Sequence, residues 1–325
     1  MIRRPSGKRY ASLSLDLDNK WSYLKTHGDA GWDTFPSYLH IVVPRTLAFL
    51  KERRLSITWF IVGQDAVLPQ HRDVLGTLAL AGHEIGNHSF HHEPWLHLYS
   101  LDQIREEFAN AENAIAAATG VTPTGFRGPG FSVSENVLNV LVERGYKYDC
   151  STFPTYLGPL ARAYYFMTAK LTPEEKRQRA KLFGTFAEGH RSLDPYRWQG
   201  LPLVEVPVTT MPLFKVPIHV SYLLYLARFS VLAAVNYFRF ALWMCERAGA
   251  EPSILLHPLD FLGGDDDADL SFFPAMDKPA TWKLDLVSRF LAELTKRFTV
   301  LPMGAYVETL SEVKLPQRQP VFAAR

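Results

Sequence analysis

Short apolar runs of strand-like composition alternate with amphipathic runs of helical period through the first 150 residues of this chain. Strand, helix and strand repeated in this order are typical of parallel sheets, because each helix carries the chain back to begin the next strand in the same direction. A chain of 325 residues is long enough to bury a core of that size. We therefore predict an α/β fold built on parallel strands.

The predicted strands are short apolar runs bounded by turn-forming residues. They cover residues 10–17, 56–62, 83–87, 125–127, 146–149, 203–208, 253–256 and 299–301. The predicted helices have apolar residues at helical spacing. They cover residues 41–53, 70–81, 101–119, 135–144 and 281–298. Polar, chemically useful residues follow several of the strands, which favours a barrel with its site at the carboxyl ends of the strands.

The alternation stops after Cys150. From about residue 153 to 250 the chain carries a charged helix, opened by the capping-box pattern Thr172-Pro173-Glu174-Glu175, and a long apolar segment. No repeat or low-complexity linker separates two domains. We predict one domain over residues 1–325, with a long helical insertion at about 153–250 before the last strands.

Residues 216–245 are mostly apolar, and Arg228 and Arg239 are the charged residues that interrupt them. The two arginines are eleven positions apart and so share one face of a helix. We predict a single amphipathic helix here, with a narrow polar edge. Its broad apolar face can pack on the main body. Alternatively, part of this face, at about residues 219–245, can meet a bilayer surface or a lipid tail. No uncharged run reaches the roughly 18 residues of a membrane span.

Net charge, cysteine content and the N-terminal sequence indicate which partners and which cellular compartment to expect. The net charge of +2 gives no reason to expect a nucleic-acid partner. Cys150 and Cys245 are far apart and predict buried thiols rather than a disulfide framework. The basic N-terminus leads into a strand without an apolar segment or a cleavage site. We expect a cytoplasmic protein, placed at the inner face of the membrane if the apolar helix meets lipid.

Five of the eleven histidines lie between positions 83 and 97. His88 and His92 are four apart, so one helical turn or a tight loop can bring their imidazoles to a single metal ion. Histidine pairs of this spacing also occur on solvated surfaces, so the pair alone does not establish a metal site. A third ligand from elsewhere in the chain is needed. We interpret the other three, His83, His91 and His97, as structural or peripheral residues.

Asp16 and Asp18 lie at the end of the first predicted strand. Strand alternation places both side chains on the same side of the sheet. One carboxylate with His88 and His92 makes a mixed oxygen and nitrogen site with open positions, as expected of a hydrolytic metal rather than a structural one. The other carboxylate is then free to take a proton from water. The spacing alone does not decide which of Asp16 and Asp18 is the metal ligand and which is the base.

Three later strand ends carry suitable groups. Arg127 could hold a carboxylate through two parallel hydrogen bonds, and Gly130 offers a bare backbone N–H for a developing oxyanion. Asp149 adds a further carboxylate, and His257 ends an apolar strand where a general acid could act. Each also has a structural explanation: a Pro-Gly turn, a cap, or a core histidine.

Taken in order from Asp16 to His257, these motifs resemble those of the polysaccharide deacetylase family, also called the NodB-homology or carbohydrate esterase family 4 group. The resemblance implies a distorted (β/α) barrel of seven strands, a divalent metal (zinc, with cobalt or nickel as alternatives) and hydrolysis of an N-acetyl or similar amide. It also implies a role for each residue: base for Asp16, metal ligands for Asp18, His88 and His92, positioning of the base for Arg127, acid for His257 and tuning of that acid for Asp149.

This chain departs from the family pattern at several places, among them the absence of a tryptophan near Asp149 and the long apolar insertion after Cys150. Gly130 follows Pro129 where a tyrosine usually forms a wall of the groove, and Trp59-Phe60 stands where two phenylalanines are usual. The backbone N–H at position 130 is kept. The departures concern the groove that holds a polymer more than the reaction.

We therefore predict a metal-dependent hydrolase that removes an acyl group from an amino sugar, either lipid-linked or part of a saccharide conjugate. An amidase acting on a small or cyclic amide is the alternative with the same chemistry, and a metal-binding pseudoenzyme is the alternative without it. The Asp-Leu-Asp motif also resembles those of nucleotide-sugar glycosyltransferases and aspartyl-phosphate phosphatases. Neither class explains His88, His92 and His257.

Overall fold

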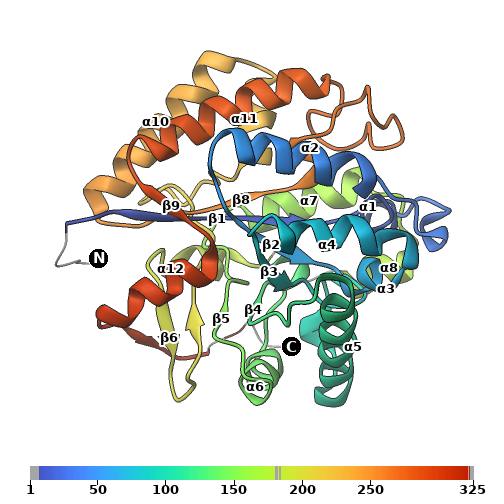
Figure 1. The fold of residues 1–325 in the computed structure, drawn as a ribbon, viewed down its shortest axis with the longest axis horizontal. Coiled ribbons are helices and arrows are strands. Elements are labelled where there is room, and N and C mark those ends of the chain that lie inside the picture. The colour runs from blue at the N-terminus through green and yellow to red at the C-terminus, as the bar shows by residue number, and fades with distance from the viewer. Residues whose placement is uncertain (1–6, 180–181, 183, 321, 323–325) are drawn as a thin grey trace.

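Seven parallel strands follow one another in the sheet of the computed structural model, which describes residues 7–179, 182, 184–320 and 322. Their order is β7-β5-β4-β3-β2-β1-β8. They are β1 (Tyr10–Leu17), β2 (Thr58–Ile61), β3 (Glu84–Asn87), β4 (Gly125–Phe126), β5 (Tyr148–Asp149), β7 (Val204–Glu205) and β8 (Ser253–Leu256). The sheet curls into a half-barrel, which confirms the predicted distorted barrel (Figure 1).

Three short strands extend this sheet. They are β6 (Tyr196–Trp198), β9 (Thr299–Leu301) and β10 (Gln317–Arg318). β6 runs antiparallel to β7, whereas β9 pairs with β1 and β10 pairs with β6 in parallel. The sheet is therefore mixed at one edge only.

Helices cover the outer face of the half-barrel (Figure 1). The helices before the insertion are α1 (Lys20–His27), α2 (Leu39–Glu52), α3 (Gly63–Val67), α4 (Arg72–Leu80), α5 (Leu101–Thr119) and α6 (Glu135–Glu143). The later ones are α7 (Gly158–Thr168), α8 (Pro173–Gln178), α9 (Val220–Ala227), α10 (Val231–Ala248), α11 (Ala280–Thr295) and α12 (Met303–Thr309). Seven of the eight residues of β1 are buried, as expected for a parallel strand covered on both faces.

Helix α12 closes the amino end of the half-barrel. Its first two backbone N–H groups donate to strand side chains: Met303 N to Thr58 Oγ1 (2.7 Å) and Gly304 N to Glu84 Oε2 (2.7 Å). Met303 also packs in an apolar cluster with Phe60. The carboxyl ends of the strands are therefore the end that remains for a site.

Gly125 shows how closely neighbouring strands pack. A Cβ atom at this position would lie 1.9 Å from Cζ of Tyr148, whose ring crosses β4 from β5. A side chain at position 125 would therefore displace the Tyr148 ring.

The apolar segment 216–245 is two helices, and the prediction of one continuous helix is wrong. α9 ends at Ala227, and Ser230 caps the start of α10 by accepting a hydrogen bond from Ala233 N (3.2 Å). Ser is favoured at such a cap because its oxygen pairs a backbone N–H that the helix leaves free. The chain turns there, and the two helices pack together, with α10 also packed along α11 (Figure 1).

The segment after β7 returns to the opposite edge of the half-barrel. Thr209 N donates to Ser253 O on β8 (3.0 Å), and Ser253 N donates to Thr209 Oγ1 (2.8 Å). The α9–α10 hairpin therefore leaves the sheet at Thr209 and rejoins it at Ser253. No helix in the part of the chain that the structure describes combines the length and hydropathy needed to cross a membrane.

Candidate metal centre and active site

The carboxyl ends of β1 and β3 bring Asp18, His88 and His92 together, as predicted. His92 Nε2 lies 2.9 Å and His88 Nε2 3.3 Å from the same oxygen, Asp18 Oδ1. All three side chains are buried, and their ligand atoms lie within 4.8 Å of one another. Within the described residues, Asp18, His88 and His92 are the one set of Asp, Glu, His or Cys side chains whose ligand atoms are close enough together to hold a metal ion.

A tight loop, not a helical turn, carries the two histidines. Ser89 (φ 63°) and His92 (φ 54°) both adopt the left-handed conformation, which is uncommon for residues other than glycine. Glu107 on α5 holds this loop in place, because its carboxylate accepts hydrogen bonds from Phe90 N (2.9 Å) and His91 N (2.7 Å). Glu107 was not expected from the sequence.

The hydrogen bonds of His88 select its ligand nitrogen. His88 Nδ1 lies 2.6 Å from the backbone oxygen of Arg127, which can only accept, so Nδ1 carries the proton and Nε2 presents its lone pair. Burial raises the pKa of Asp18, but the neighbouring imidazoles of His92 and His88 outweigh it and hold that pKa well below its usual value. A buried carboxylate with two imidazole nitrogens is a donor set that fits a divalent metal.

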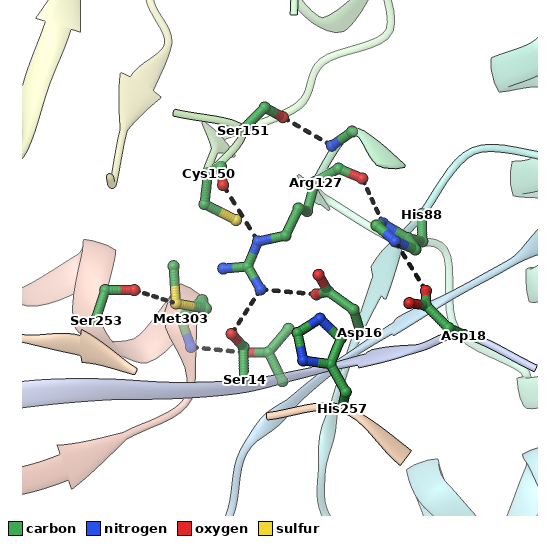
Figure 2. A network of polar contacts seen from close by, with 12 residues as sticks. Ser14, Asp16, Asp18, His88, Arg127, Cys150, Ser151, Ser253, His257 and Met303 are labelled. Atoms are coloured by element: carbon green, nitrogen blue, oxygen red, sulfur yellow. Dashed lines mark hydrogen bonds and ion pairs between the residues drawn. The ribbon is translucent and has the colours of Figure 1, made fainter. Parts of the chain in front are cut away.

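Arg127 is fully buried and holds Asp16 beside this centre (Figure 2). Its Nη1 donates to Asp16 Oδ1 (2.7 Å) and to Ser14 Oγ (2.8 Å), and its Nε donates to the oxygen of Cys150 (3.2 Å). The predicted two-nitrogen contact with the carboxylate is therefore wrong: one nitrogen bridges Asp16 and Ser14. Burial lowers the pKa of Arg127, but the nearby charge of Asp16 outweighs it and keeps the pKa above its usual value.

Gly130 lies in the turn that follows β4, with a φ of 57°. A Cβ atom there would meet Cβ of Pro94 at 3.0 Å, so both the conformation and the space favour glycine. The turn is at the same end of the sheet as Arg127. Its role as an oxyanion donor stays a prediction.

Asp149 ends β5 and faces a second buried acid that the sequence analysis missed, Glu205 on β7. Ser151 Oγ donates to Asp149 Oδ1 (2.5 Å), while Thr152 N donates to Glu205 Oε1 (3.0 Å). Burial and the mutual repulsion of two carboxylates raise the pKa of Glu205 well above its usual value, and burial raises that of Asp149. The sequence does contain one signal for this residue, because Glu205 is a charged residue inside the apolar run 203–208.

His257 follows β8 directly. Leu256 pairs in register with Leu15, so His257 and Asp16 come next on neighbouring strands. His257 Nδ1 lies 3.0 Å from Ser221 Oγ on α9, and Ser221 Oγ donates to Asp260 Oδ1 (2.7 Å). Among the described residues no hydrogen bond joins Asp149 to His257, so the tuning role of Asp149 stays a prediction.

The remaining histidines of the cluster lie outside the centre. His83 Nδ1 accepts from Ile57 N (3.1 Å), and His97 Nδ1 lies 2.8 Å from Ser132 Oγ. The side chain of His91 is half exposed and bonds to Glu107. Cys150 and Cys245 are buried free thiols, as expected.

The chain is similar to known proteins over part of its sequence. Residues 29–148 match the family model described as Polysaccharide deacetylase, a segment that contains His88, His92 and Arg127. A peptidoglycan deacetylase of Helicobacter pylori is 29% identical over 109 residues, which cover 34% of this chain and 36% of that protein. A peptidoglycan-N-acetylmuramic acid deacetylase of Bacillus subtilis is 32% identical over 105 residues, covering 32% and 39%. The aligned part thus spans little more than a third of either relative.

A crystal structure of a candidate polysaccharide deacetylase from Mycobacterium smegmatis shares the fold over the whole chain. It is 21% identical, with a TM-score of 0.66, and the alignment covers 100% of this chain and 98% of that one. Asp18 and His257 lie outside the matched family segment, but the fold brings Asp18 to His88 and His92. The chain is thus similar to the polysaccharide deacetylase family over residues 29–148, and it shares its fold with the Mycobacterium smegmatis structure over its whole length.

Proposed function

We propose that the protein is a metal-dependent hydrolase that removes an acyl group, in the first instance N-acetyl, from an amino sugar. The observation that carries this proposal is the buried Asp18–His88–His92 group beside the Asp16–Arg127 pair. A structural metal site usually fills its coordination shell with protein ligands, whereas three ligands leave room for water and substrate. The match of residues 29–148 to the polysaccharide deacetylase family model supports the same reaction class.

Asp18, His88 and His92 would hold the metal, and the donor set suits zinc, with cobalt or nickel also compatible. A divalent cation there supplies Lewis acidity, which polarises a carbonyl and lowers the pKa of water. Asp16, fixed by Arg127, takes the proton of the attacking water. His257 gives a proton to the departing amine, and the N–H of Gly130 stabilises the oxyanion.

The proposed substrate is a small or lipid-linked amino sugar, handled at the cytoplasmic face of the membrane. An apolar strip on the α9–α10 hairpin supports this: Phe229 (75%) and Leu232 (71%) are largely exposed, and Phe240 stacks on Trp243 further along α10. Arg247 lies over the Trp243 ring at 5.5 Å. Aromatic and apolar residues edged by arginine are typical of helices that lie in a membrane interface.

Metal analysis combined with an amine-release screen tests the reaction. We expect one divalent metal per chain and release of free amine from N-acetylated amino sugars. Asp16→Asn and His257→Ala should each lower turnover by about 10²–10⁴-fold with the metal retained, because each removes one proton-transfer group. Metal binding without hydrolysis of any acyl amide would instead identify a pseudoenzyme, and activity on cyclic amides alone would identify the amidase.

Flotation with liposomes tests the membrane part separately. The protein should float with anionic vesicles, and the double variant Phe240→Ser/Trp243→Ser should float less. Leu80→Ser is the matched control, because Leu80 is 89% exposed on α4, outside the strip. If the wild-type protein floats with neither anionic nor neutral vesicles, the substrate is soluble and the strip serves another purpose.

A further inference from the structure

We infer that Ser221, backed by Asp260, is a positioning residue that fixes the tautomer of His257 and leaves Nε2 as its reactive nitrogen. This inference rests on the proposed role of His257 as the acid. It assigns to the insertion a part in the reaction that neither the family motifs nor the sequence spacing indicated.

The direction of two hydrogen bonds gives the tautomer. Ser221 Oγ donates its single proton to Asp260 Oδ1 at 2.7 Å. The same oxygen lies 3.0 Å from His257 Nδ1 and can then only accept. The proton between them therefore belongs to Nδ1, and Nε2 is the nitrogen left to face the site.

Asp260 is built into the turn that carries His257. Its Oδ2 accepts from the backbone N of His257 (2.8 Å), and its own N–H donates to the oxygen of His257 (3.0 Å). Lys283 on α11, itself buried, donates to the oxygen of Leu259 (2.9 Å) in the same turn. The turn is thus held at three points, so Asp260 presents a fixed acceptor to Ser221.

Ser221 comes from a different part of the chain, 36 positions before His257. It is the second residue of α9, whose cap residue His219 contributes a half-buried ring 6.2 Å from the His257 ring. Burial and the charge of His257 lower the pKa of His219 to about 3, so His219 is neutral and does not compete as a proton donor. The first turn of α9 is therefore shaped around His257.

The arrangement suits an acid that gives up the proton on Nε2. After that transfer the imidazole must keep its proton on Nδ1, and this is the form that Ser221 stabilises by accepting from it. Without Ser221 the Nδ1 proton would lose its partner.

Nitrogen NMR of the full chain, labelled in histidine and recorded above pH 8 so that imidazoles are neutral, observes the tautomer directly. His257→Ala identifies the signals. The wild-type ring should carry its proton on Nδ1, and Ser221→Ala should shift the population toward the Nε2–H form. A wild-type ring protonated on Nε2 overturns the inference, whether or not the protein hydrolyses amides.

Kinetics supply the second readout. Ser221→Ala should lower kcat by about 10- to 100-fold with KM and metal content unchanged, and Ser221→Thr should recover most of the loss because it restores the hydroxyl. Tyr225→Phe, which removes a hydroxyl from the next turn of α9, should leave kcat unchanged. An unaltered kcat in Ser221→Ala contradicts the positioning role. A wild-type protein that binds metal but releases no amine would contradict the proposed function and leave the NMR result to decide the tautomer.

Discussion

Residues 10–149, the sheet half, and residues 153–250, the predicted insertion, contribute to the site in different ways, although the second region also supplies β6 and β7 to the sheet. In the sheet half, Asp18, His88 and Arg127 meet because parallel strands end at one edge, and main-chain groups complete their hydrogen bonds. The insertion adds side chains to residues already in place: Glu205 to Asp149 and Ser221 to His257. The sheet half thus holds the metal ligands and the base, whereas the insertion adjusts where protons reside.

The largest effect should follow from removing a ligand in the sheet half. Asp18→Ala removes the only carboxylate of the proposed metal set, and we expect metal affinity to fall by more than about 100-fold, since loss of an outer-shell partner alone typically costs 10- to 100-fold. Metal content after gel filtration measures this. Asp73→Ala, an exposed aspartate on α4, should keep its metal. A fully loaded Asp18→Ala protein would show that the ligands lie elsewhere.

Next in size is the buried ion pair. Arg127→Lys keeps the charge but cannot reach Asp16, Ser14 and the Cys150 oxygen together, so we expect the free energy of unfolding to fall by about 3 kcal/mol. Urea unfolding measures the change. Arg144→Lys, at the partly exposed pair with Glu112, should cost less than about 1 kcal/mol. Equal losses at the two sites would remove the distinction between the centre and the surface.

The buried carboxyls of Asp149 and Glu205 join the two regions and predict a pH-dependent free energy of unfolding. The pKa values of Asp149 and Glu205 are both raised, so the folded protein keeps a proton that the unfolded chain loses above about pH 4.5. The stabilisation is complete below that pH and is lost as pH rises through the raised pKa values. Its slope is at most about 1.4 kcal/mol per pH unit for one proton.

Glu205→Gln should flatten this slope, because it removes one of the two carboxyls whose pKa is raised, while the part caused by burial of Asp149 remains. Its stability relative to wild type should therefore increase with pH when urea unfolding is compared between pH 5 and 8. Glu106→Gln replaces an exposed glutamate on α5 and should run parallel to wild type. Parallel curves for Glu205→Gln as well would show that the pair does not retain a proton.

The smallest expected effect compares equivalent helix caps in the two regions. Ser134 caps α6 in the sheet half and Ser230 caps α10 in the insertion, each through a hydrogen bond to the third helical N–H. Ser134→Ala and Ser230→Ala should each cost about 1 kcal/mol in unfolding free energy. Only Ser230→Ala should also lower kcat, since α10 packs on the helix that carries Ser221. If both variants keep full kcat, the hairpin is insensitive to its cap.

Sequence patterns predicted the sheet half well because its signals are local. Tyr10–Leu17 and Leu101–Thr119 have the predicted bounds, as does Ser253–Leu256 beyond the insertion. The meeting of the β1 carboxylates with His88 and His92 could be predicted because the carboxyl ends of parallel strands lie at one edge of the sheet, with β2 between β1 and β3. The choice of Asp18 over Asp16 as the ligand came from the family resemblance.

The insertion was less predictable for equally physical reasons. Apolar periodicity continues across Arg228–Ser230, so it cannot show that the helix breaks there, and only Ser230 as a cap residue marks the new start. Glu205 meets Asp149 from 56 positions away, and the contact depends on β7 pairing with β5. Side-chain contacts set by the pairing of distant strands leave no local pattern to read.

The two backbone neighbours Thr209 and Ser253 have a consequence for how such proteins can diversify. Everything between them, both helices of the hairpin included, leaves and re-enters the sheet at nearly the same point. The chain between these two points can change in length at a small entropic cost, because the cost of loop closure grows slowly with length. Its composition is limited by side chains such as Leu224 and Phe238, which belong to the main core. Changes in the exposed part of the hairpin can therefore alter which molecules approach His257 while the metal ligands and the base stay where the strands put them.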